Sequence, residues 1–156
     1  MSRQLISSGA KWETEVGYSR AVRTGSQIFV SGTTAVDGRS RVVGEGDIRA
    51  QAKHIFGIIE ESLQKAGACL EDVVRTRMFV TDIADAEAIG QVHGEVFGRI
   101  RPVTTLVEVR SLIDPRLRVE IEAEAVAGSG GADAVILAGG NSKRMGRKKS
   151  QIRMGC

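Results

Sequence analysis

Residues 118–126 constrain the fold of this chain more than any other segment. Apolar and charged side chains alternate strictly along it. The apolar set is Val119, Ile121, Ala123 and Ala125, and the charged set is Arg118, Glu120, Glu122 and Glu124. Because successive side chains of a β-strand point to opposite faces, this segment predicts a strand with one face in a core and the other face polar.

Two other segments have the period of an amphipathic helix. In the first, which stops at Gly67, apolar residues recur every three or four positions. They are Ile48, Ala52, Ile55, Phe56, Ile59, Leu63 and Ala66. The second follows Asp82 and Asp85, which are both candidate N-caps. Its inward face consists of Ala86, Ile89, Val92, Val96 and Phe97. The sequence therefore predicts two helices.

The remaining apolar runs are short and are typical of strands. Residues 27–31 follow the turn signal Thr24-Gly25-Ser26, and residues 18–23 can pair with them as a hairpin. Residues 73–80 and 103–109 are two further candidates. The order hairpin, helix, strand, helix, strand, strand predicts an α+β fold, in which a mixed sheet carries both helices on one face. A partner subunit could cover part of the other face, so we expect symmetric self-association.

Charge is distributed unevenly along the 156 residues. From Gly128 onward there are six basic residues and one acid; subtracting them from the totals of 22 and 19 leaves 16 basic and 18 acidic residues in 1–127. The predicted folded part is thus mildly acidic and offers no general attraction to a phosphate backbone. The basic cluster at 143–149 has no interleaved aromatic residues that could stack on bases. We therefore do not expect nucleic-acid binding.

Other classes of protein and site are also disfavoured. No segment approaches the roughly 18 apolar residues of a membrane helix, and Met1–Leu5 lack an apolar stretch of signal-peptide length. The histidines and cysteines are not spaced as metal ligands. They are His54, His93, Cys69 and Cys156. We predict a cytoplasmic protein without a metal or cofactor.

A domain boundary is expected after Ala127. The run Gly128-Ser129-Gly130-Gly131 has the composition of a flexible linker, and the residues behind it do not continue the strand and helix pattern. We predict one domain over residues 1–127. Residues 128–156 would be a linker and a fragment with no domain of its own to join, which we expect to be disordered.

Several short segments resemble the YjgF/RidA family in content, order and spacing. They are Gly17-Tyr18-Ser19-Arg20-Ala21-Val22, Phe29-Val30-Ser31-Gly32, Arg101-Pro102 and Val119-Glu120-Ile121-Glu122-Ala123. The resemblance covers about residues 1–127 and implies a chorismate-mutase-like fold and a homotrimer with small-molecule clefts at the subunit interfaces. Deaminating members of that family hydrolyse enamines and imines such as 2-aminoacrylate, releasing a 2-oxo acid and ammonia.

The resemblance also implies roles for individual residues. Glu120 would hold the attacking water and Tyr18 would close the cleft. The substrate would contact Ser31, Gly32, Thr104 and Leu106. Plainer interpretations stand beside these roles, because Glu120 is one of three glutamates on a polar strand face and Tyr18 could be a half-buried aromatic residue.

At Thr104 the chain departs from the deaminating members, which carry there an arginine that grips the substrate carboxylate. A threonine donates one hydrogen bond, whereas an arginine offers two charge-assisted ones. Arg110 would lie about 20 Å along the strand, at about 3.3 Å per residue, and Arg101 precedes Pro102 and could point elsewhere. Gly90 likewise replaces a side-chain amide. The chain thus resembles an arginine-lacking branch of the family.

Residues 133–149 resemble the first strand and phosphate loop of the molybdenum-cofactor guanylyltransferase-like nucleotidyltransferases. Arg144 and either Lys148 or Lys149 would supply positive charge to nucleotide phosphates. One strand and one loop cannot build the rest of such a domain, so we expect no transferase activity from this truncated fragment.

Three hypotheses of function remain open. The first is a weak or altered imine and enamine hydrolase, favoured by the set of Tyr18, Ser31, Gly32 and Glu120. The second is a trimeric ligand-binding or regulatory protein without turnover, favoured by Thr104. The third is a nucleotide-handling protein acting through its C-terminal segment.

Overall fold

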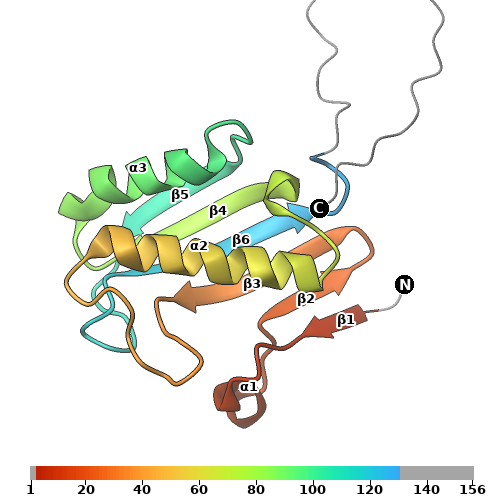
Figure 1. Cartoon of the computed structure of the whole chain (residues 1–156), viewed down its shortest axis with the longest axis horizontal. Helices are drawn as coiled ribbons and strands as arrows, with labels where there is room; N and C mark the ends of the chain where they lie inside the picture. Colours follow the sequence, from red (N-terminus) through yellow and green to blue (C-terminus); the bar gives the residue numbers. More distant parts are fainter. Residues whose placement is uncertain (1–2, 131–156) are drawn as a thin grey trace, which may run out of the picture.

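The computed structural model describes residues 3–130, which form one mixed six-stranded sheet with helices on one side (Figure 1). The elements in chain order are β1 (Arg3–Ile6), α1 (Lys11–Val16), β2 (Ala21–Thr24), β3 (Gln27–Thr34), α2 (Ile48–Lys65), η1 (Leu70–Asp72), β4 (Val73–Val80), η2 (Ile83–Asp85), α3 (Ala86–Phe97), β5 (Val103–Glu108) and β6 (Val119–Val126). The predicted α+β fold is confirmed.

The strands lie in the order β1-β2-β3-β6-β4-β5. Only β4 and β5 run parallel, joined through α3, while every other neighbouring pair is antiparallel. The strand with the strictest alternation, β6, therefore sits between β3 and β4 near the middle of the sheet. This position explains its pattern, because a central strand buries one whole face against the helices.

Both long helices pack against the same face of the sheet, in front of it in Figure 1. We call this the helix-covered face and the opposite one the open face. On β6 the residues of the helix-covered face are all 2% exposed or less: Val119, Ile121, Ala123 and Ala125. The predicted core strand and the predicted inward helix residues Ile55, Ile59, Ile89 and Val92 thus meet in one apolar core.

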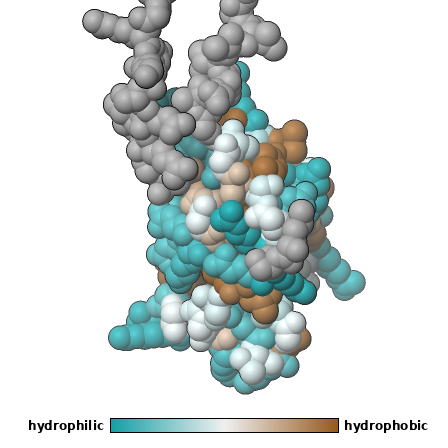
Figure 2. Space-filling view, turned by 90° about the vertical axis from the view of Figure 1, so that its right-hand side faces the viewer, coloured by the Kyte–Doolittle hydropathy of each residue, from teal (hydrophilic) through white to brown (hydrophobic). Residues whose placement is uncertain are grey.

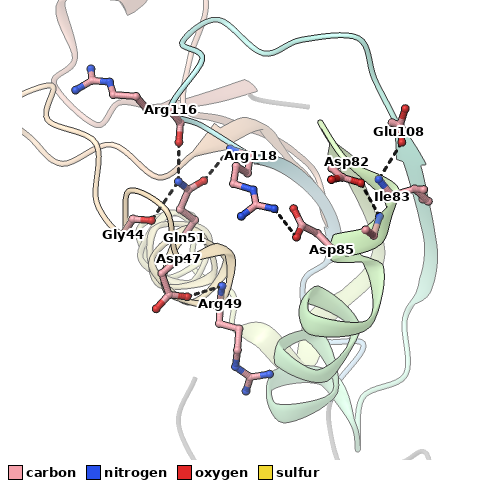
Figure 3. Close-up of polar contacts among 11 residues, drawn as sticks. Gly44, Asp47, Arg49, Gln51, Asp82, Ile83, Asp85, Glu108, Arg116 and Arg118 are labelled. Carbon is pink, nitrogen blue, oxygen red and sulfur yellow. Dashed lines mark hydrogen bonds and ion pairs between the residues drawn. The ribbon is translucent and has the colours of Figure 1, made fainter.

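Helix α2 begins where the Asp47 carboxylate accepts hydrogen bonds from the backbone N–H groups of Arg49 and Ala50. One polar residue, Gln51, is wholly buried on its inner side. The Gln51 amide donates to the carbonyls of Gly44 (3.2 Å) and Arg116 (2.8 Å), and its oxygen accepts from the Arg118 N–H (2.9 Å) (Figure 3). The helix is therefore fixed to the loops before α2 and β6.

Helix α3 follows the two aspartates that were predicted as caps. Asp82 accepts from the Ala84 N–H and opens η2, while Asp85 makes no capping bond and instead pairs with the Arg118 guanidinium at 2.7 Å (Figure 3). Asp85 therefore acts at the helix start as an ion-pair partner. This bond joins the start of α3 to the start of β6.

The first two elements were not expected from the sequence. Strand β1 pairs antiparallel with β2 at the edge of the sheet, and three of its four residues are exposed. Helix α1 has six residues, too few for a recognisable period. Local polar contacts stabilise it: the Glu13 carboxylate accepts hydrogen bonds from the hydroxyls of Ser7 and Ser8 at 2.5 Å each and from the Ser8 N–H at 2.9 Å.

The start of the predicted linker lies against the domain. Ser129 donates to the Asp72 carbonyl (3.4 Å) and the Gly130 N–H donates to the Asp72 carboxylate (3.0 Å). The predicted disordered fragment from residue 131 on lies outside the described residues. Within residues 3–130 no helix is long and apolar enough to cross a membrane. Figure 2, a view from the right-hand side of Figure 1, shows apolar residues reaching the surface in separate patches among hydrophilic ones.

Candidate functional site

The open face of the sheet carries three glutamates of β6 whose surroundings differ. Glu122 pairs with Arg77 at 3.4 Å, and Glu124 pairs with Arg77 at 2.9 Å and with Arg75 at 3.7 Å. Glu120 lies opposite Phe79 of β4, which offers no charge. Among residues 3–130 it has no ion-pair partner within 4.0 Å. Glu122 and Glu124 are thus surface ion pairs, whereas Glu120 is kept apart from them.

Glu120 lies against a bulge in β3. The pairing of β3 with β6 shifts register between Val30 and Thr33, which leaves Ser31 and Gly32 outside the regular ladder. A Cβ atom built on Gly32 would overlap the Glu120 carboxylate oxygen. Only glycine therefore lets this carboxylate lie directly over the strand backbone, which gives Gly32 a physical reason for its place in the predicted site.

The bulge is stabilised by Arg20, a residue for which the sequence predicted no role. One terminal nitrogen, Nη2, donates to the Ser31 carbonyl (2.9 Å), the Ser31 hydroxyl and the Gly32 carbonyl (2.6 Å). The Nε atom is buried and has no hydrogen-bond partner among the described residues. Burial lowers the pKa of the Arg20 guanidinium, an effect that Tyr18, Glu13 and Glu120 oppose. Arg20 is the cation of this cluster.

Burial also changes the Glu120 carboxyl. It raises the pKa of Glu120 above the ordinary value of 4.5; Arg20 opposes the rise and Glu122 adds to it. A carboxyl with a raised pKa can both accept and return a proton closer to neutral pH than an ordinary surface glutamate. Such behaviour is what a general acid–base residue requires.

Tyr18 joins the same cluster through the turn after α1. Gly17 ends the helix with a left-handed φ of 82°, and the Tyr18 N–H donates to the Glu13 carbonyl at 3.0 Å. Tyr18 is 39% exposed and near enough to Arg20 to influence its pKa.

Burial alone would raise the pKa of Glu13, but the hydrogen bonds from Ser7 and Ser8 outweigh it and lower that pKa. Glu13 therefore stays a carboxylate beside Arg20.

Thr104 and Leu106, by contrast, do not join Glu120 within one chain. In the parallel register of β4 and β5, Thr104 pairs with Thr76 and Leu106 with Met78, and both partners are buried on the helix-covered face. Glu120 is on the open face, and β4 separates its strand from β5. Four of the six predicted site residues thus lie together, and the other two lie on the opposite face.

The two arginines considered as substitutes for the missing cation also lie elsewhere. Strand β5 ends at Glu108, so Arg110 is in the loop behind it and the predicted continuation of the strand to Val109 is wrong by one residue. Arg101 has a left-handed φ of 54°, and its Nε donates to the Gly98 carbonyl at 3.4 Å. It therefore turns back toward the end of α3.

No other group of residues in the described part of the chain resembles a cofactor site. Residues 3–130 contain no group of three or more His, Cys, Asp and Glu side chains suited to a metal ion. A surface hollow between the end of α3 and the start of the linker, lined in part by Glu71, Glu95, Arg99 and Gly130, shares no residue with the predicted site. The cluster around Glu120 remains the candidate site.

The mixed sheet with two helices on one face, and a carboxylate set over a glycine bulge on the other, define a small α+β domain of the YjgF type. Comparison with known proteins agrees. A family model described as Endoribonuclease L-PSP matches residues 9–127. The chain belongs to this family, which includes the YjgF, RutC and RidA proteins.

Individual relatives support the assignment. An uncharacterized protein of Streptomyces coelicolor is 41% identical over 80% of this chain and 92% of its own length. The 3-aminoacrylate deaminase RutC of Acinetobacter baylyi is 36% identical over 69% of this chain and 85% of its own. A Mycobacterium tuberculosis crystal structure, described as a member of the YjgF/YER057c/UK114 family, is 50% identical, covers 81% of this chain and 100% of its own, and superposes with a TM-score of 0.73.

The C-terminal segment does not share in this agreement. The family model ends at residue 127, and the resemblance of residues 133–149 to a nucleotidyltransferase is not borne out by the comparisons. These residues also lie outside those that the structure describes.

Proposed function

We propose that the protein hydrolyses small imines and enamines to a carbonyl compound and ammonia. The observation that carries the proposal is the setting of Glu120: it lies over Gly32, has no ion-pair partner among the described residues and has a pKa raised by burial. The deaminase name of the Acinetobacter relative points to the same class of reaction. A nuclease is less well supported, because Arg75 and Arg77 of the open face are paired with glutamates and are not free to hold phosphates.

The reaction needs one group that moves protons twice. The imine nitrogen first takes a proton from solvent, and Glu120 takes a proton from a water molecule as the water oxygen bonds to the iminium carbon, which gives a carbinolamine. Glu120 then returns its proton to the carbinolamine nitrogen, the C–N bond breaks as ammonia leaves, and the protonated carbonyl compound releases to solvent the proton that was taken up at the start. No oxidant, reductant or metal is required for this balance.

The predicted site also needs a second copy of the chain. Thr104 and Leu106 lie on the other face of the sheet from Glu120, so one protomer cannot present all six residues to one ligand. The exposed edge strand β5 and its neighbours carry apolar residues on the open face, among them Val103 (63% exposed) and Val107 (40% exposed). We propose that β5 of one protomer meets the Glu120 cluster of the next in a homotrimer.

A second candidate function is ligand binding without turnover. It is favoured by Thr104, which replaces the arginine of the deaminating members and supplies no charge to grip a substrate carboxylate. The same cluster would then hold a small molecule for regulation. The two candidates share a site and differ only in whether ammonia is released.

The deciding experiment measures ammonia and 2-oxo acid release from enzymatically generated 2-aminoacrylate, and ammonia or amine release from uncharged imines. We expect release by the wild type, loss of about 100-fold or more in Glu120→Gln, and little change in Glu122→Gln, a matched glutamate on the same strand face. Faster ammonia release from the carboxylated substrate by Thr104→Arg would show that position 104 is where the substrate carboxylate binds. If no variant releases ammonia, the protein binds without chemistry.

Shared sites can be tested by mixing two inactive variants. Glu120→Gln removes the acid–base group, and Thr104→Asp places a negative charge at the other half of the proposed site. If the site is shared between protomers, co-expressed chains will form some sites that are intact in both halves and will recover activity. Absence of recovery in confirmed mixed trimers would contradict the shared site.

A further inference from the structure

A hydrogen-bonded chain runs from inside the protein to Thr104. The Thr76 hydroxyl lies 2.8 Å from the Thr104 hydroxyl and 3.0 Å from Nε2 of His93. Thr76 is fully buried in β4, Thr104 is exposed on the edge strand β5, and His93 projects from α3 toward them. The chain thus links one residue each of α3, β4 and β5 and ends at Thr104, the position where the deaminating members carry an arginine.

The number of hydroxyl protons limits which residue can be the donor in each of these two hydrogen bonds. A threonine hydroxyl has one proton to donate and can accept from other donors. With Thr76 as the donor to Thr104, its only proton is used in that hydrogen bond. The 3.0 Å contact with His93 is then a hydrogen bond only if the histidine Nε2 carries a proton and donates to Thr76. It follows that the Thr104 proton is not needed inside the chain and can point outward.

The surroundings of His93 favour a neutral, fixed ring. It packs against the rings of Phe56 and Phe97, with centroid distances of 6.0 and 4.8 Å. Burial lowers the pKa of His93. A neutral imidazole with its proton on Nε2 therefore satisfies the buried Thr76 hydroxyl without burying a charge.

We propose that His93 and Thr76 are positioning residues that hold the Thr104 hydroxyl as a hydrogen-bond donor toward the ligand. This inference deepens the proposed function and rests on it for the ligand class. A fixed donor selects an oxygen acceptor, such as a carboxylate or carbonyl oxygen, and does not favour an amine or iminium group at that position. It is a neutral and weaker substitute for the arginine.

Two measurements test the proposal without turnover. The first is a ¹⁵N NMR measurement of the His93 ring, for which we expect the neutral tautomer protonated at Nε2. The second is the dissociation constant of pyruvate, the product expected from 2-aminoacrylate, in wild type and variants. Thr76→Val removes the hydroxyl at nearly constant volume and should weaken pyruvate binding about three- to tenfold, the effect expected for one hydrogen bond.

Matched variants separate this role from general stabilisation. Thr104→Val should weaken binding as much as Thr76→Val, the double variant should be no worse than either single one, and Thr76→Ser should restore wild-type affinity. If the hydrolase is active, Thr76→Val should raise KM and leave kcat unchanged, whereas Glu120→Gln should lower kcat about 100-fold or more and retain pyruvate binding.

Three results would overturn the proposal. They are a His93 ring protonated only at Nδ1, wild-type protein that does not bind pyruvate, and Thr76→Val protein whose pyruvate affinity equals that of wild type. The tautomer measurement needs no variant and remains decisive if Thr76→Val does not fold. Pyruvate binding with the expected variant pattern but without ammonia release would instead refute the hydrolase and keep the positioning role.

Discussion

The two faces of the sheet are built from the same strands but differ in the surroundings of their side chains. On the helix-covered face of β6, Val119 and Ile121 are fully buried and belong to the apolar core. On the open face of the same strand, Glu120 and Glu122 alternate with them and are half-buried. The first face is defined by apolar volume, whereas the second is defined by which charged group each side chain meets across the strands. We propose that stability depends mainly on the first face and chemistry on the second.

This difference predicts opposite responses to substitution. Changes on the helix-covered face should act on the free energy of unfolding, because they leave cavities in a packed core. Changes on the open face should act mainly on the reaction, because the side chains there can reorient or reach water.

The largest effect is expected for Ile121→Ala, which removes a fully buried side chain from the core. The free energy of unfolding should fall by about 2–5 kcal/mol, measured by urea denaturation. Glu122→Gln, one position along the strand, should change it by less than about 1 kcal/mol, since surface ion pairs contribute little. Equal losses in the two variants would contradict the division of the faces.

The next effect in size is expected for Gly32→Ala. Its new Cβ would overlap the end of the flexible Glu120 side chain, which can move away at little cost in stability. The displaced carboxylate should slow ammonia release about 100-fold. As a control, Gly57→Ala, where an added Cβ meets nothing within 4 Å on α2, should leave the rate unchanged and raise stability by about 0.5–1 kcal/mol. A fully active Gly32→Ala enzyme would rule out this placement of Glu120.

A smaller effect is expected for Arg20→Lys. A lysine keeps a positive charge but cannot reproduce the planar donor group that bonds the Ser31 and Gly32 carbonyls, so the bulge should loosen. We expect a decrease in kcat of about tenfold, consistent with loss of one charge-assisted hydrogen bond. Arg75→Lys on β4 serves as the control, and an Arg20→Lys rate equal to that of the control would show that Arg20 does not position the site.

The smallest effect is expected for Glu124→Gln. It removes the partner of Arg75 and Arg77 on a partly exposed surface. The loss in stability should be below about 1 kcal/mol and should shrink further at high salt, because exposed ion pairs are screened. Urea denaturation at two salt concentrations measures both quantities. A loss that is large and independent of salt would mean that Glu124 has a role beyond the surface.

Much of the fold could be predicted from periodicity. The alternation over residues 118–126 and the helical face from Ile48 to Ala66 predicted β6 and α2 to within one residue, since burial against one partner imposes a regular pattern. Helix α1 could not be found in this way, because the contacts that form it join the Glu13 carboxylate to Ser7 and Ser8. Such local polar contacts leave no period.

The site was predictable only in part. The family resemblance grouped Tyr18, Ser31, Gly32 and Glu120, which the structure brings together around Arg20. It did not indicate Arg20, whose role depends on a bulge that is visible only once β3 pairs with β6. It also could not show that Thr104 faces Thr76 and His93, because the face of a residue on β5 follows from its register with β4.

Glu120 is the carboxyl of the open face that we propose for proton transfer. The most direct test is a pH titration of the Glu120 side-chain carboxyl by ¹³C NMR, with its signal assigned from Glu120→Gln. Because the folded-state pKa is raised, Glu120 contributes stability below the ordinary value and loses that contribution as pH rises through the folded-state pKa. We predict a midpoint clearly above 4.5. A midpoint at or below 4.5 would show an ordinary surface glutamate and contradict the account.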